Sequence, residues 1–266
     1  MKKTGKRGDH PRRPGSRLPS LPREIAILYE DDAIVVVNKP AGLLSVPIEG
    51  SSAPSVQSLL SAEMKSQGGR ALVVHRIDRF TSGLLLFAKT QPDREALIRQ
   101  FIAHTPVRQY LAVVRGILPA MTGTLVHHLR WWKDQFQRTT RERDPEGARA
   151  ELRYSVERKL RDATLVRVTL VTGLQNQIRV QFLAIGHPVV GDRKYAPEEA
   201  SERKIQRLAL HAARLAFTHP RTGETVRFEC DLPADMSQLV RAWSMPTPSG
   251  HGDARRSKPK RRPPRQ

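Results

Sequence analysis

Apolar residues are confined to the middle of this chain. Residues 1–23 and 249–266 are rich in Pro, Gly, Ser and Arg and hold almost no apolar side chains. Segments of this composition bury too little surface to offset the entropy lost on ordering, so we expect both ends to be disordered basic tails. The fold must therefore come from residues 24–248, a length that suits one large domain.

The two ends also carry most of the excess positive charge. The chain has 46 Lys and Arg against 26 Asp and Glu, a formal net charge of +20. Residues 1–23 hold eight Lys/Arg and one Asp, and residues 249–266 hold seven Lys/Arg and one Asp. This uniform sign predicts attraction to the phosphates of a nucleic acid through counterion release. Solubilising tails without a dedicated partner are the alternative.

Several classes of protein lack support in the sequence. No apolar run approaches the roughly 20 residues of a membrane span, and no apolar core of a secretory signal stands near the start. The single cysteine, Cys230, forms neither an internal disulfide nor a multi-cysteine zinc site. The motifs GxxxxGK[ST], GxGxxG and HExxH are absent. We therefore expect a cytoplasmic protein that has no cofactor, no metal and no association with membranes.

Hydrophobic patterning predicts more strand than helix in the central region. We expect strands at 25–29, 33–38, 83–90, 108–115, 164–172, 208–217 and 224–230, and helices at 56–64, 92–103 and 177–185. Long strands with scattered helices indicate an α+β fold with a mixed, mostly antiparallel sheet and flanking helices. Residues 131–147, with many charges and a proline, are expected to be the least ordered part of this domain.

Two adjacent tryptophans stand at the start of that charged stretch. Trp131 and Trp132 lie between Arg130 and Lys133. We interpret them as part of a half-buried hydrophobic cluster. A patch that stacks on RNA bases is the alternative.

One short segment combines residue types suited to catalysis. Asp78 stands between Arg76 and Arg79, directly before the apolar run of the strand at 83–90. Neighbouring guanidinium groups favour the ionised carboxylate, and a fixed carboxylate can act as a nucleophile or a base without a cofactor. A surface loop with a local ion pair is the alternative. An aspartyl-phosphate site is not supported, because its second acid would fall on Phe80.

Residues 75–90, HRIDRFTSGLLLFAKT, resemble the signature HRLDRxTSGLLLxAK of the RluA family of pseudouridine synthases. Five further segments are similar to motifs of that family, and all six segments occur along the chain in the same order as in the family. They are NKPAGL at 38–43, RQYLAVVRG at 108–116, TGLQNQIRV at 172–180, IGHPVVGD at 185–192, and LHA at 210–212 with HP at 219–220. Six segments in order are far more specific than any single one. The resemblance implies the pseudouridine synthase fold.

The resemblance also implies a reaction and three site residues. Uridine in an RNA chain is isomerised without a cofactor: the N1–C1′ bond breaks, the uracil turns, and C5 bonds to C1′. The essential catalytic aspartate of the family falls on Asp78, the tyrosine beside the target base on Tyr110, and the arginine that pairs with the aspartate on Arg179. Asp78 either attacks C1′ or takes a proton from C2′, and both routes remain open.

Four basic residues are expected to bind RNA. In the family, the arginine at the position of Arg76 is implicated in displacing the target nucleotide. Lys39, Arg79 and Arg108 are further candidates for contacts with phosphates. The expected partner is rRNA or tRNA, and nothing in the pattern requires more than a monomer.

Some positions depart from the family pattern. Leu174–Gln175–Asn176 replace RTH before the QIR element, and Gln181 replaces the histidine that follows it. These departures concern RNA contacts rather than Asp78, Tyr110 and Arg179. The alternative function is a non-catalytic RNA-binding or ribosome-assembly factor that retains the fold. A binding module has no need for those three residues, so their presence favours the enzyme.

Overall fold

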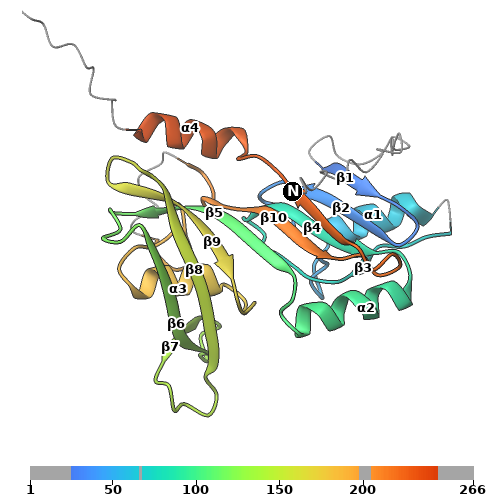
Figure 1. Ribbon diagram of the computed structural model, residues 1–266, viewed down its shortest axis with the longest axis horizontal. Coiled ribbons are helices and arrows are strands. Elements are labelled where there is room, and N and C mark those ends of the chain that lie inside the picture. Colours follow the sequence, from blue (N-terminus) through green and yellow to red (C-terminus); the bar gives the residue numbers. More distant parts are fainter. Residues whose placement is uncertain (1–24, 66–67, 198–204, 245–266) are drawn as a thin grey trace, which may run out of the picture.

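The computed structural model describes residues 25–65, 68–197 and 205–244, and the two basic ends lie outside these ranges. The described residues form one sheet of eleven strands with four helices (Figure 1). Only β4 and β10 pair in parallel among the named strands. The expected α+β fold with a mixed, mostly antiparallel sheet is therefore confirmed. No helix in the described ranges is long and apolar enough to cross a membrane.

The sheet has the strand order β1-β2-β4-β10-β5-β9-β8-β6-β7, with β3 paired to β4 and β11 paired to β10. The strands are β1 (Ala26–Glu30), β2 (Ile34–Lys39), β3 (Leu72–Val73), β4 (Ser82–Ala88), β5 (Val107–Arg115), β6 (Thr122–Trp131), β7 (Gln137–Thr140), β8 (Ala148–Lys159), β9 (Ala163–Leu170), β10 (Leu210–Thr218) and β11 (Thr225–Glu229). The helices are α1 (Val56–Met64), α2 (Gln91–Ile102), α3 (Gln177–Ala184) and α4 (Ala234–Trp243).

Strand β4 is buried along its whole length because a helix covers each of its faces. Leu85 and Phe87 belong to the cluster that contains Leu60 of α1. Leu84 and Leu86 belong to the cluster that contains Leu97 of α2. This explains the continuous apolar run in the sequence, since a strand buried on both faces shows no alternation.

A side-chain cap lies at the N-terminus of α1 and of α2. The Ser55 hydroxyl accepts from the Ser58 backbone N–H, and the Ser58 hydroxyl accepts from the Ser55 backbone N–H, which forms a capping box. Thr90 caps α2, and Pro92 follows in the first turn, where its missing N–H costs nothing.

The second half of the sheet packs on α3 and α4. Phe182 of α3 and Met236 of α4 join the largest hydrophobic cluster together with residues of β5, β8 and β9. We did not predict β6, β7, β8 or α4 from the sequence. β6 and β8 carry many polar side chains on an exposed face, which weakens their apolar signal. Residues 131–147 are more ordered than expected, because β7 pairs with β6.

A polar chain, buried at Ser82 and His211 and partly buried at Cys230, joins β4, β10 and the residue after β11. The Ser82 hydroxyl lies 2.8 Å from Nδ1 of His211, and the Cys230 sulfur lies 3.1 Å from its Nε2. Burial lowers the pKa of His211 to about 4 and raises the pKa of Cys230 to about 12. Next to this chain, Gly83 has a φ of +113°, and a Cβ there would overlap the backbone of Ala212. This glycine therefore permits the close approach of β4 to β10.

We expect Cys230 to be unreactive in the folded protein. At pH 8 a thiol with a pKa near 12 is ionised in about one molecule in ten thousand, against about one in four for free cysteine. Alkylation by iodoacetamide, followed by mass spectrometry, should therefore be about a thousand-fold slower than for free cysteine. The denatured protein is the control. Equal rates in the native and denatured states would show that burial does not raise the pKa of Cys230 in the folded protein.

Candidate active site

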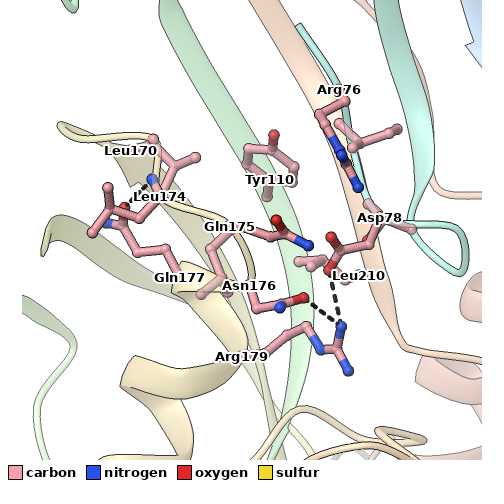
Figure 2. Close-up of a pocket in the computed structure, with 14 residues that line it drawn as sticks. Arg76, Asp78, Tyr110, Leu170, Leu174, Gln175, Asn176, Gln177, Arg179 and Leu210 are labelled. Atoms are coloured by element: carbon pink, nitrogen blue, oxygen red, sulfur yellow. Dashed lines mark hydrogen bonds and ion pairs between the residues drawn. The ribbon is translucent and has the colours of Figure 1, made fainter. Parts of the chain in front are cut away.

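A pocket of about 200 Å³ lies where the two halves of the sheet meet (Figure 2). Arg76 and Asp78 line it from the loop before β4, Tyr110 from β5 and Leu210 from β10. Most of the remaining wall is residues 173–179, which connect β9 to the first turn of α3. The structure thus brings Asp78, Tyr110 and Arg179 to one pocket, although they are far apart in the sequence.

The loop that carries Asp78 is held in place on both sides. The Ser45 hydroxyl donates to the Ile77 carbonyl at 2.7 Å and accepts from the Ile77 N–H at 3.2 Å. The Gly42 N–H donates to the Arg79 carbonyl at 2.8 Å. These bonds fix the backbone immediately before and after Asp78, so its carboxylate has a defined position. Residues 39–45, which include most of the NKPAGL segment, form the clamp.

Lys39 is not the open residue we expected, because its side chain is fully buried. Its ammonium donates to the carbonyls of Pro40, Leu43 and Arg79 at 2.9, 2.8 and 3.0 Å. Burial lowers the pKa of Lys39 to about 7, and the charge of Asp78 opposes that change. Three carbonyl acceptors match the three N–H groups of an ammonium. Lys39 is therefore a structural part of the clamp.

Arg179 joins two carboxylates and one amide. Its Nε and Nη2 donate to the two oxygens of Asp192 at 2.8 and 2.7 Å. Its Nη1 donates to Oδ2 of Asp78 at 3.0 Å and to Oδ1 of Asn176 at 2.8 Å. Burial lowers the pKa of Arg179, but the hydrogen bonds and charge of Asp192 and the charge of Asp78 outweigh it and raise the pKa overall. The guanidinium is therefore a permanent, oriented cation.

Tyr110 supplies a neutral aromatic ring to the pocket (Figure 2). Burial raises its pKa to about 12, with Arg108 lowering it and Asp78 raising it further. The phenol therefore keeps its proton at all pH values near neutrality. A buried ring at the wall of a small pocket is suited to contact the face of a planar base.

The other three predicted RNA-binding residues differ in accessibility. Arg76 and Arg79 are exposed, and the Nε of Arg79 donates to the Gly42 carbonyl at 2.8 Å. Arg108 is only 9% exposed. Its guanidinium lies against Gly173, where a Cβ would overlap Nη1, and 5.8 Å from the centre of the Phe101 ring. Arg108 therefore supports the loop at the pocket wall and is not the open RNA contact we expected.

The arrangement is suited to nucleophilic or general-base chemistry. The Asp78 carboxylate lies 3.0 Å from the Arg179 guanidinium, and the neighbouring Tyr110 ring can hold a planar substrate. Among the described residues, no group of three or more His, Cys, Asp or Glu side chains is placed to hold a metal ion.

Comparisons with known proteins agree on one family. Residues 33–184 match the family model described as RNA pseudouridylate synthase. The chain belongs to this family. It is 40% identical over 224 residues to the RNA pseudouridine synthase YlyB of Bacillus subtilis, covering 82% of this chain and 73% of that protein. It is 35% identical over 229 residues to the ribosomal large subunit pseudouridine synthase D of Zymomonas mobilis, covering 82% and 72%.

Solved structures support the pseudouridine synthase fold. The human RNA pseudouridylate synthase domain containing 4 is 21% identical and has a TM-score of 0.67, over 83% of this chain and 94% of that one. The resemblance stated from the sequence motifs is thus confirmed for family and fold. The protein is an RNA pseudouridine synthase by family, and its individual site residues remain predictions.

Sequence reasoning missed two partners of Arg179. Asp192 lies in the IGHPVVGD segment, which we quoted for the resemblance without giving this acid a role. Asn176 has a φ of 55°, a left-handed conformation that asparagine tolerates well. Gln181 also differs from expectation: it is fully buried and donates to the carbonyls of Leu125 and Ala150. Its replacement of the family histidine therefore affects packing rather than RNA contacts.

Lys39→Met should destabilise the fold rather than weaken RNA binding alone. The substitution leaves three inward-facing carbonyls without their donor, which should lower the free energy of unfolding by about 3 kcal/mol or more. Urea unfolding followed by circular dichroism measures this. Lys159→Met removes an exposed lysine and should change stability very little. A stable Lys39→Met protein with weaker, less salt-dependent RNA binding would restore the original expectation of an RNA contact.

Asp192→Asn should disturb both stability and catalysis, because it removes one charge from a buried ion pair. We expect a loss of about 3 kcal/mol in unfolding free energy, and a fall in kcat larger than any change in KM. Asp134→Asn breaks an exposed pair with Arg138 and should leave both nearly unchanged. A wild-type kcat in Asp192→Asn would show that the two hydrogen bonds from Arg179 to Asp192 are not needed to orient Arg179.

Proposed function

We propose that this protein converts uridine to pseudouridine in ribosomal or transfer RNA, with Asp78 as the catalytic nucleophile or base. The observation that carries the proposal is the 3.0 Å contact between Arg179 and Asp78 in a pocket that Tyr110 also lines. Family membership supports the reaction type. The geometry supports the assignment of roles to these three residues.

The two oxygens of Asp78 have different surroundings. Oδ2 accepts from Arg179, whereas no group in the described part of the chain hydrogen-bonds Oδ1. Oδ1 is therefore available either to attack C1′ of the target ribose or to accept the C2′ proton. In both routes the N1–C1′ bond breaks, C5 bonds to C1′ and loses its proton to solvent, and N1 takes up a proton from solvent. If Asp78 attacks C1′, its bond to C1′ breaks as C5 bonds there; if it takes the C2′ proton, that proton returns to C2′. Tyr110 would face the detached uracil and keep it in the pocket.

Large-subunit ribosomal RNA is the target that the comparisons favour. Relatives at 35–37% identity carry the name ribosomal large subunit pseudouridine synthase D. The target uridine must leave its stack to reach a pocket of about 200 Å³, so unpaired positions cost least. The pocket is complete within one chain, which supports a monomer. We also propose a cytoplasmic location, as the site of its RNA substrate.

Asp78→Asn should abolish the reaction while leaving the fold intact. The assay is tritium release from large-subunit rRNA labelled at C5 of uridine and isolated from cells without this enzyme, with tRNA prepared in the same way. We expect a loss of about a thousand-fold or more, since asparagine is neither a nucleophile nor a base here. Circular dichroism and RNA binding should match the wild type.

The alternative function makes the opposite prediction in the same assay. A non-catalytic RNA-binding or assembly factor would bind both RNAs and release no tritium from either. In that outcome Asp78 is a structural ion-pair partner of Arg179, and the proposed function is wrong. Tritium release from tRNA alone would support the proposed reaction and identify tRNA, rather than large-subunit rRNA, as the substrate.

A further inference from the structure

Two adjacent tryptophans at the β6–β7 hairpin are both partly exposed. Trp131 ends β6 and Trp132 begins the turn, and their exposed fractions are 43% and 44%. Adjacent exposed tryptophans are uncommon on a protein surface and indicate binding. The contacts of the two rings differ, and this difference separates their roles.

Trp132 lies among cations that are already neutralised. Its ring centre is 5.0 Å from Cζ of Arg130 and 6.0 Å from Cζ of Arg138. Arg130 pairs with Asp144 at 3.0 Å, and Arg138 pairs with Asp134. Both arginines that face the Trp132 ring are therefore already paired with carboxylates.

Trp131 faces a different cation, Lys194, although Arg138 also lies 5.2 Å from the centre of the Phe136 ring. The Lys194 ammonium lies 5.7, 4.8 and 5.5 Å from the ring centres of Trp131, Phe136 and Tyr195. It donates to the Gln135 carbonyl at 3.0 Å. Within the described ranges no carboxylate lies in salt-bridge distance of Lys194. Its side chain is exposed, so its positive charge is open to an anionic ligand.

This group is continuous with the active site. The Tyr195 ring centre lies 4.8 Å from Cζ of Arg179, the arginine that contacts Asp78. The ring of Phe136 meets Tyr195 edge to face at 5.5 Å, and the Tyr195 hydroxyl accepts from the Gln137 N–H. A row of aromatic rings and cations thus runs from the pocket wall to the hairpin surface.

We propose that Trp131, Phe136 and Lys194 form a stacking surface for single-stranded RNA adjoining the target uridine. An unpaired base stacks on the open face of Trp131, and Lys194 contacts a phosphate of the same segment. Duplex RNA does not fit this surface, since its bases are already stacked and paired. The inference rests on the proposed function for the identity of the nucleic acid, and it adds the element that binds the flanking strand.

Trp131→Ala tests the stacking, and Trp132→Ala is its matched control. The two residues are neighbours with the same exposure, but only Trp131 lies beside the open charge of Lys194. In the tritium-release assay we expect Trp131→Ala to raise KM about five-fold to a hundred-fold with kcat retained at saturating RNA. Trp131→Phe should restore most of the loss, and Trp132→Ala should resemble the wild type. Equal effects of both alanine variants, or no effect of Trp131→Ala, would overturn the proposal.

Lys194→Gln tests the phosphate contact. The logarithm of the RNA association constant should fall less steeply with the logarithm of salt concentration, by about one phosphate contact. Lys159→Gln, an exposed lysine at the end of β8, should leave the slope unchanged. If Lys194→Gln has the same salt dependence of RNA binding as the wild type, Lys194 does not contact a phosphate.

A binding measurement separates failure of this surface from failure of the proposed reaction. A short single-stranded RNA with a fluorescent label, and the same sequence as a duplex, would be titrated into wild type, Trp131→Ala and Trp132→Ala. Preferential binding of the single strand that is lost only in Trp131→Ala supports the surface even if no tritium is released. Equal affinity for single strand and duplex in all three proteins would refute it even if the enzyme is active.

Discussion

The guanidinium group of Arg179 joins the loop before β4 to the segment that follows α3. Asp192, almost completely buried, takes two of the N–H groups of Arg179 in a fork and thereby fixes the direction of a third toward Asp78. A buried cation with one partner would pay a large desolvation cost. Arg179 instead donates to two carboxylates and one amide, and these hydrogen bonds offset the cost of removing its charge from water. The orientation of Asp78 relative to Tyr110 depends on this junction.

The junction works because the loop it meets is itself rigid. Residues 39–45 hydrogen-bond the backbone on both sides of Asp78. The buried ammonium of Lys39 donates hydrogen bonds to three backbone carbonyls. The strand that follows is packed between α1 and α2. Main-chain hydrogen bonds and core packing therefore position the backbone at Asp78, and Arg179 orients the carboxylate through one of its two oxygens.

The features that were predictable from sequence are those with a local signal. Apolar runs located β4 and β10, apolar spacing located α1, Pro92 located the start of α2, and the family motifs located Asp78, Tyr110 and Arg179. Burial of Lys39 was not predictable, because a lysine near a glycine turn is usually exposed, and only the fold supplies its three carbonyls. The role of Asp192 and the placement of β6–β8 depend on pairings between distant segments. The exposure of Trp131 likewise follows from its position at a hairpin end, which composition does not reveal.

The parallel pairing of β4 with β10 also determines when during synthesis the pocket can be completed. Ser82 meets His211 across 129 positions of the chain, and Leu210 forms part of the pocket wall. A nascent chain that has not reached β10 lacks both the neighbour of β4 and that wall. Contacts of such long range close slowly, since the loop entropy is lost before they form. The emerging polypeptide therefore carries the loop with Asp78 through a long part of translation before the pocket can form, and the pocket is complete only after nearly the whole domain has left the ribosome.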